Sequence, residues 1–264
     1  MRMLRAILLI VLLAPVGTVV VSAQNRGILT VSGRVTINSK KEKLLRKRFY
    51  LFRGGFTANK ALMDRLASTS VLSRDCFYCK MNASPGYIKW LKDNDCESPY
   101  CREITKEDRD KVPEFQAAYD KAEKQYSGKP KLAQKWLTTF LAPDLKDGFY
   151  RQRKASIDTI LGSIKPLQSS MTDTVSIQAV FIDIPLEKKV VDPKTGKESY
   201  SETFLVSNLV PIEIGGKGYL WACEVEIGSP PKVTTVSLPA ADTAKCKLIP
   251  QKAADCDSSS CKQP

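Results

Sequence analysis

The stretch GYLWACEVEI, residues 218–227, decides the fold class because its polar and apolar side chains alternate with a period of two. In a β-strand this alternation places Cys223 on the same face as Trp221, pointing into the core. Glu224 and Glu226 then lie on the opposite, solvated face. The stretch therefore predicts a strand that packs one side against a hydrophobic core.

Further strand-like segments form two zones. In residues 24–55, GILTVSGRVTI and KRFYLFRGG are short β-branched and aromatic runs bounded by turn residues. In residues 171–240, DTVSIQAVFIDIP, ETFLVSNL and KVTTVSL join the opening stretch. Neither zone alone has enough strands for a stable sandwich, whereas about six or seven strands together suffice. We therefore expect one discontinuous β-sandwich.

Residues 56–170 between the two zones have a helical period and predict about four or five short helices. Caps or prolines mark their starts at Thr57, at Ser84 before Pro85, at Thr105 with Asp108 three residues on, and at Pro113. The expected core of this block is Trp136, Leu137, Phe140, Leu141, Ile157, Ile160 and Leu161.

The predicted fold class is therefore α+β: an Ig/prealbumin-like antiparallel β-sandwich interrupted by an inserted helical block. Residues 241–264 form a polar tail that contains cysteines. The alternative is an independent α domain between two small sheets, which would leave more strand edges exposed.

Three segments resemble the opening and closing strands of a known module: LTVSGRVTI, RKRFYLFRGG and ETFLVSNLVPIEIGGKGYLWACEVEI. They are similar to carboxypeptidase regulatory-like, or transthyretin-like, β-sandwich modules. The matching positions are Gly33, Val35, Phe204, Val206, Leu209 and Tyr219. The resemblance covers about 100 of the 264 residues, and the helical block and the basic hairpin depart from it. It implies an accessory or surface module without catalytic residues.

Residues 1–23 have the pattern of a signal peptide. Arg2 and Arg5 precede an apolar run, and the segment ends in the small residues Val-Ser-Ala. We expect cleavage before Gln24 and a secreted or periplasmic protein. The alternative is an uncleaved anchor, but the run is short for a spanning helix and contains proline and glycine. No later segment of the sequence is apolar enough to span a membrane.

The chain is strongly basic, with a formal net charge of +13 that falls by two if Arg2 and Arg5 are removed. This charge favours an anionic polysaccharide, lipid headgroup or envelope protein as partner, and nucleic acid is not expected. The densest basic run, KKEKLLRKR, gives the candidate anion-binding residues Lys40, Lys41, Lys43, Arg46, Lys47 and Arg48. Alternatively, the run is a hairpin loop whose lysines protect a strand edge and cover apolar surface.

The chain contains no histidine, which excludes Ser-His-Asp and Cys-His nucleophiles and histidine metal ligands. Any hydrolase would depend on carboxylates. Glu224 and Glu226 would lie about 7 Å apart, between the spacings of retaining and inverting glycosidases. Strand alternation alone explains this pair, so we assign no catalytic residue, no metal and no cofactor.

Eight cysteines in an exported chain predict disulfides. The candidates are Cys76, Cys79, Cys96, Cys101, Cys223, Cys246, Cys256 and Cys261. The first four have a hairpin-like spacing, whose antiparallel pairing would join Cys76 to Cys101 and the two inner cysteines to each other. Other connectivities remain open. Cys246 could reach Cys223, and the last two cysteines would close a short loop or tie the tail back.

Two alternatives use the same first four cysteines, Cys76, Cys79, Cys96 and Cys101: a thiol-disulfide oxidoreductase and a four-cysteine metal site. An oxidising compartment disfavours free thiolates, and LASTSVLSRD is not a convincing strand to precede a redox-active Cys-x-x-Cys. The sequence therefore predicts an exported, disulfide-stabilised, non-catalytic binding or structural module of the cell envelope or extracellular space.

Overall fold

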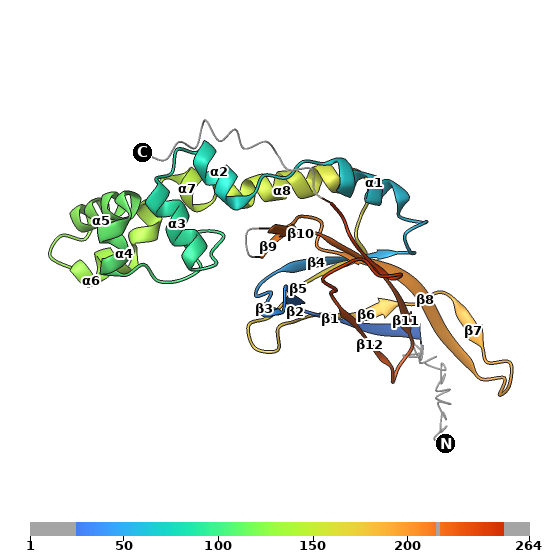
Figure 1. Cartoon of the computed structure of the whole chain (residues 1–264). Coiled ribbons are helices and arrows are strands. Elements are labelled where there is room, and N and C mark those ends of the chain that lie inside the picture. Colours follow the sequence, from blue (N-terminus) through green and yellow to red (C-terminus); the bar gives the residue numbers. More distant parts are fainter. Residues whose placement is uncertain (1–24, 215–216, 251–264) are drawn as a thin grey trace, which may run out of the picture.

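The computed structural model describes residues 25–214 and 217–250 (Figure 1). The predicted signal peptide, Cys256 and Cys261 lie outside the described residues. The strands are β1 Arg26–Ser32, β2 Arg34–Ile37, β3 Lys40–Lys43, β4 Arg48–Arg53, β5 Gln168–Met171, β6 Gln178–Pro185, β7 Lys189–Val191, β8 Glu198–Ser207, β9 Ile212–Ile214, β10 Lys217–Tyr219, β11 Trp221–Gly228, β12 Val233–Ser237 and β13 Cys246–Leu248. The helices are α1 Lys60–Ser68, α2 Arg74–Lys80, α3 Pro85–Asp93, α4 Lys106–Lys111, α5 Pro113–Gln125, α6 Pro130–Lys135, the 3-10 helix η2 Leu137–Phe140, α7 Pro143–Lys146 and α8 Gly148–Leu161. The expected α+β class is confirmed.

Two sheets share one hydrophobic core. The first has the order β12-β1-β6, and the second has the order β13-β11-β8-β4-β5 with β7 paired to β8. Their inward side chains include Leu29, Val31, Phe49, Leu51, Phe181, Phe204, Val206, Trp221, Cys223 and Val225. The prediction of antiparallel strands needs one correction, because β1 and β12 run parallel. After β11 the chain crosses to the first sheet, and β12 enters it from the same end as β1.

Helices cover the outer face of the second sheet, so that its central strands are buried on both sides. On β8, Phe204 and Val206 face the shared core, whereas Leu205 packs toward Leu62 of α1 and Ile160 of α8. A strand buried on both faces has a continuous apolar sequence, which explains FLVSNL. Part of the helical block therefore forms a third layer on the sheet.

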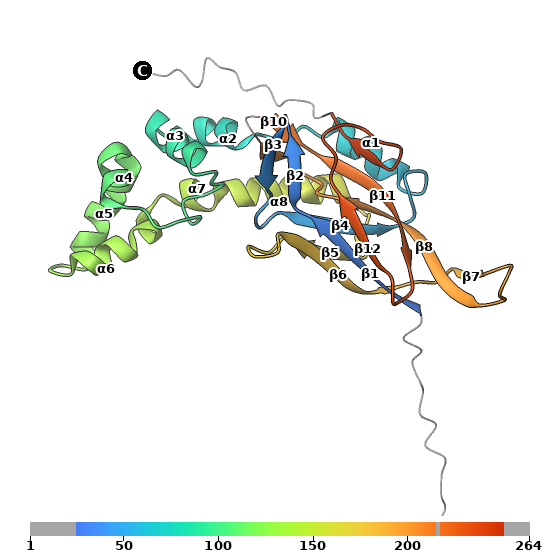
Figure 2. The same ribbon diagram turned by 60° about the horizontal axis from the view of Figure 1, so that its bottom comes forward.

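The rest of the helical block forms a lobe of its own, made of α2–α7 and the start of α8. Figures 1 and 2 show it at one end of the molecule, with α8 running back toward α1 beside the sheets. Its core is rich in aromatic side chains: Phe77, Tyr78, Tyr87, Trp90, Phe115 and Phe149. We call this region the helical lobe.

Most predicted helix starts are confirmed. The hydroxyl of Ser84 accepts a hydrogen bond from the Tyr87 N–H at 3.1 Å, and Thr105 forms the expected capping box with Asp108. Helix α5 begins at Pro113. The first helix begins at Lys60 and not beside Thr57, because residues 56–59 form a turn before it.

Two core and boundary expectations are corrected. Trp136 is 47 % exposed, although Leu137, Leu141 and Ile160 are buried as expected. The predicted tail contributes a strand, because β13 pairs with β11. The sheet therefore extends beyond residue 240.

Candidate anion-binding surface

The basic run forms a strand and a turn on the surface of the sheet region. Strands β2 and β3 are joined by the two-residue turn Asn38–Ser39, and both turn residues have positive φ angles, 48° and 64°. This is the backbone twist that two-residue hairpins favour. Val35 and Ile37 on one face of β2 are buried in the shared core. The hairpin is therefore anchored. The basic run is only partly a loop: residues 40–43 form β3, which pairs with β2 alone among the described strands, and a turn follows before β4. Protection of this strand edge by its lysines stays a prediction.

The outer face of this hairpin carries cations that face one another. The register places Arg34 opposite Lys43 and Thr36 opposite Lys41. Like charges directly opposite each other destabilise a strand pair. Arg34, Lys41 and Lys43 lie on this outer face, whereas Lys40 lies opposite Ile37 on the other face and Arg46 lies in the turn after β3. All five side chains are exposed, and we call this group the basic hairpin.

Counter-ions for the basic hairpin are missing from the part of the chain that the structure describes. None of the ion pairs among the described residues involves these five side chains. Glu42, the acidic residue of β3, is half-buried. An external anion would relieve the repulsion between neighbouring cations. The geometry therefore suits binding of a polyanion at the surface.

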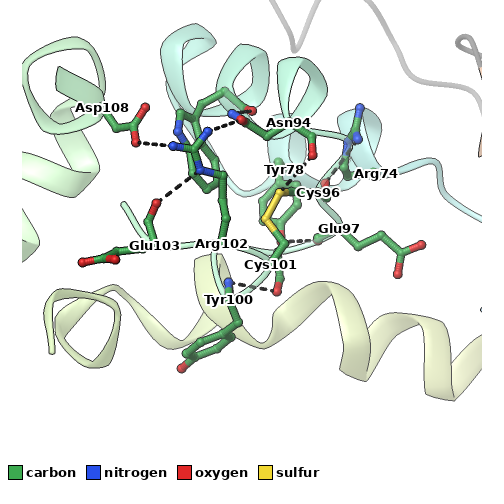
Figure 3. The surroundings of a disulfide bond; sticks show 12 residues. Arg74, Tyr78, Asn94, Cys96, Glu97, Tyr100, Cys101, Arg102, Glu103 and Asp108 are labelled. Atoms are coloured by element: carbon green, nitrogen blue, oxygen red, sulfur yellow. Dashed lines mark hydrogen bonds and ion pairs between the residues drawn. A yellow bond between two sulfur atoms is a disulfide. The ribbon is translucent and has the colours of Figure 1, made fainter. Parts of the chain in front are cut away.

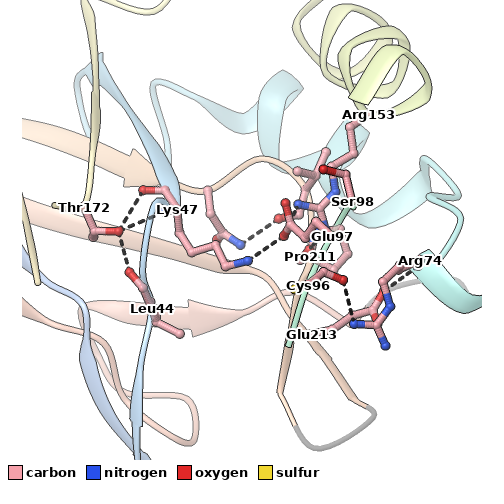
Figure 4. Close-up of polar contacts among 12 residues, drawn as sticks. Leu44, Lys47, Arg74, Cys96, Glu97, Ser98, Arg153, Thr172, Pro211 and Glu213 are labelled. Carbon is pink, nitrogen blue, oxygen red and sulfur yellow. Dashed lines mark hydrogen bonds and ion pairs between the residues drawn. The ribbon is translucent and has the colours of Figure 1, made fainter. Parts of the chain in front are cut away.

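Lys47, the fifth predicted anion-binding residue, has a structural partner instead. Its Nζ lies 2.5 Å from Oε1 of Glu97, and Nη1 of Arg153 lies 2.9 Å from the same oxygen (Figure 4). Nη2 of Arg153 donates to the carbonyl of Pro211 at 2.9 Å. Burial alone would raise the pKa of Glu97, but Arg153 and Lys47 outweigh it and hold that pKa below its ordinary value. This Glu97 cluster joins the sheets to the helical lobe.

Arg48, the sixth candidate, is exposed on β4, where its Nη1 donates to the hydroxyl of Ser169 at 3.1 Å. The structure therefore divides the six predicted residues. Lys40, Lys41, Lys43 and Arg46 belong to the basic hairpin, Lys47 belongs to the Glu97 cluster, and Arg48 contacts β5.

The described cysteines are all disulfide-bonded. Cys223 pairs with Cys246, directly opposite it on β13. Cys96 pairs with Cys101, so the predicted antiparallel pairing, Cys76 with Cys101 and Cys79 with Cys96, is wrong in both parts.

The physical reason lies in the local turn (Figure 3). The Cys101 N–H donates to the Ser98 carbonyl at 3.3 Å, and the Tyr78 hydroxyl holds the Glu97 carbonyl at 2.9 Å. The segment therefore bends back on itself and brings Cys96 and Cys101 together.

The Cys-x-x-Cys lies on α2, where Cys76 is 2 % exposed and Cys79 is 8 % exposed. Reactive thiols need partial exposure and thiolate character. In the described ranges, 25–214 and 217–250, no three histidine, cysteine or acidic side chains are grouped so as to hold a metal ion. The arrangement matches structural cysteines better than a redox or zinc centre.

The carboxylate pair on β11 also has structural partners. Oε2 of Glu224 accepts the Phe56 N–H at 2.9 Å, and Oε1 of Glu226 accepts the Ser201 hydroxyl at 2.7 Å. A Cβ added at Gly55 would lie 2.0 Å from Oε2 of Glu224. Glu224 is half-buried, because the loop before α1 covers the face that the sequence predicts to be solvated. Its geometry supports a role in holding this loop.

Comparison with protein-family models, with curated proteins and with solved structures finds no match. None of the helices in the described ranges combines the length and apolarity needed to cross a membrane. The function is therefore inferred from the geometry of the described residues.

Sequence reasoning missed three residues of this surface and its support. The alternation in GRVTI could have placed Arg34 beside the basic run. Glu97 lies 50 positions from Lys47, and Arg153 lies 56 positions further on. No local pattern connects residues at such separations.

Proposed function

We propose that this protein is an exported, disulfide-stabilised and non-catalytic module that binds anionic polysaccharide of the cell envelope or extracellular space through its basic hairpin. The observation that carries the proposal is the exposed pairing of Arg34 with Lys43, next to Lys41 and without a described counter-ion. A binding site for a repetitive polyanion needs such a rigid row of cations, whereas small-molecule sites are concave and mostly apolar.

Two further observations support the proposal. Val35 and Ile37 anchor the hairpin in the core, so its backbone loses little conformational freedom on binding. The disulfides Cys96–Cys101 and Cys223–Cys246 fit an oxidising compartment, as the predicted signal peptide also requires.

We also propose a fold type for the two sheets. Two sheets with a common core suit an Ig/prealbumin-like sandwich of the carboxypeptidase regulatory-like kind, which would serve as a scaffold for surface binding. A four-cysteine metal protein would need Cys96 and Cys101 as thiolates, and their disulfide bond argues against that function. A thiol-disulfide oxidoreductase would use the Cys-x-x-Cys of Cys76 and Cys79, and the burial of both side chains argues against it.

The test is retention of the full exported protein on a dextran sulfate matrix under a salt gradient. The variant K40Q/K41Q/K43Q/R46Q removes four cations of the basic hairpin and leaves the Glu97 cluster intact. The control K60Q/K89Q/K154Q/K189Q removes four exposed lysines that each pair with an acidic side chain. We expect the hairpin variant to elute at clearly lower salt than the control. Equal elution of the two variants would reject the basic hairpin as the binding surface.

A further inference from the structure

A second basic surface lies at the far end of the helical lobe, on α6. Both views place α6 at the end of the molecule away from the sheets (Figures 1 and 2). Leu132 is 38 % exposed and Trp136 is 47 % exposed. The Trp136 N–H donates to the Leu132 carbonyl at 3.0 Å, so the two side chains lie one helical turn apart. They form an exposed apolar pair.

The chain around this pair carries positive charge only. From Lys124 to Pro143 the sequence has no aspartate or glutamate. Its lysines are all exposed, and no described ion pair uses them: Lys124, Lys129, Lys131 and Lys135. Nζ of Lys135 lies 5.8 Å from the centre of the Trp136 ring. Lysines thus flank the exposed apolar pair along the chain, and Lys135 lies close to the Trp136 ring.

The opposite side of this segment is firmly packed. Ala133 is fully buried, and Leu137 is 1 % exposed. Tyr126 and Phe140 make an edge-to-face contact, with ring centres 6.2 Å apart. This packing therefore fixes the backbone that carries the exposed apolar pair.

We propose that this α6 surface contacts an anionic lipid bilayer. Trp136 and Leu132 enter the interfacial region, and Lys129, Lys131 and Lys135 lie among the phosphate headgroups. Tryptophan favours this region because its ring is amphipathic, and lysines add attraction to anionic lipid. A soluble polyanion would complement the lysines but would leave the apolar pair exposed. The charge and the apolar pair together therefore favour the bilayer over a soluble polyanion.

This surface is separate from the basic hairpin, and the inference does not depend on the proposed polysaccharide binding. The two surfaces lie on different parts of the fold, one on β2–β3 and one on α6. Variants of one surface leave the other unchanged. Failure of one proposal can therefore be distinguished from failure of the other.

Tryptophan fluorescence gives a direct test with the full protein. The chain has three tryptophans; Trp90 is 6 % exposed and Trp221 is fully buried, so a change on binding reports Trp136. With vesicles of equal parts phosphatidylglycerol and phosphatidylcholine, we expect a blue shift and protection from acrylamide quenching. Vesicles of phosphatidylcholine alone should give neither effect. No shift with the anionic vesicles would overturn the proposal.

Two variants with one control separate charge from insertion. K129Q/K131Q/K135Q should weaken partitioning to anionic vesicles about a hundredfold, from roughly fivefold for each lysine. The control K60Q/K89Q/K154Q has the same net charge and should bind within a few-fold of the wild type. W136S should lose the blue shift and bind more weakly.

Each contrary result has a definite meaning. Equal weakening of the lysine variant and its control would show general charge attraction and reject the α6 surface. Binding to dextran sulfate that needs the α6 lysines, without vesicle binding, would assign this surface to a soluble polyanion instead. The hairpin variant K40Q/K41Q/K43Q/R46Q should keep the fluorescence shift, and its loss there would also reject the proposal.

Discussion

Replacing Glu97 by glutamine should destabilise the protein strongly, because Glu97 is the shared anion of the cluster between the sheets and the helical lobe. Lys47 and Arg153 both contact Oε1 of Glu97, at 2.5 and 2.9 Å. Breaking a buried ion pair by removing one partner costs about 3–5 kcal/mol. The three side chains are 14–20 % exposed, so solvent reduces this cost to about 2–3 kcal/mol. We expect the midpoint of thermal unfolding to fall by about 4–12 °C.

The assay is urea unfolding at neutral pH, followed by circular dichroism, with a matched control. Glu103 is exposed, and among the described residues its side chain makes no ion pair. E103Q removes the same charge and should change the free energy of unfolding by no more than about 0.5 kcal/mol. If E97Q lies within that margin of E103Q, the cluster does not hold the two parts together and the argument fails.

Further predictions concern acid stability, disulfide pairing and the loop before α1. The pKa of Glu97 is lowered in the folded state, so its contribution is complete above the ordinary value of 4.5 and is lost as the pH falls through the lowered pKa; acid titration of E97Q should lack this loss. Peptide mapping without reduction should find Cys96 linked to Cys101, and a Cys76–Cys101 peptide would contradict the structure. Gly55→Ala should displace the Glu224 carboxylate and lower the free energy of unfolding in urea by about 1–3 kcal/mol. An unchanged midpoint would show that the loop before α1 can move to make room for the added methyl group.

Local sequence patterns predicted strand β11 and the helix starts well, because the interactions that form them join residues close in sequence. The alternation in residues 218–227 identified β11, and it placed Cys223 in the core. Ser84 and Thr105 were recognised as caps because a capping side chain binds an N–H only three residues away. Such signals need no knowledge of the rest of the fold.

The exposure of Trp136 shows where a helical pattern fails to predict which side chains are buried. Trp136 ends α6 with φ −102° and ψ 8°, and the chain continues as a 3-10 helix. The change of period turns Trp136 outward while Leu137 takes the buried position. A count of apolar residues could not detect this change of period.

Long-range pairs were also beyond the sequence. Lys47 was grouped with its basic neighbours, but its partner Glu97 comes from the disulfide loop. The spacing of four cysteines allowed three connectivities, and a local turn selected the short Cys96–Cys101 loop. The parallel pairing of β1 with β12 depends on a crossover between sheets.

Binding through the basic hairpin is tested most directly by the salt dependence of binding to dextran sulfate for the wild type, for K40Q/K41Q/K43Q/R46Q and for K60Q/K89Q/K154Q/K189Q. Each cation that displaces counter-ions from a polyanion contributes roughly 0.7–0.9 to the slope of log affinity against log salt. We expect the hairpin variant to lose about three units of slope while the control keeps the wild-type slope. Equal slopes for the two variants would contradict this expectation, since the basic hairpin would then not be the surface that meets the anion.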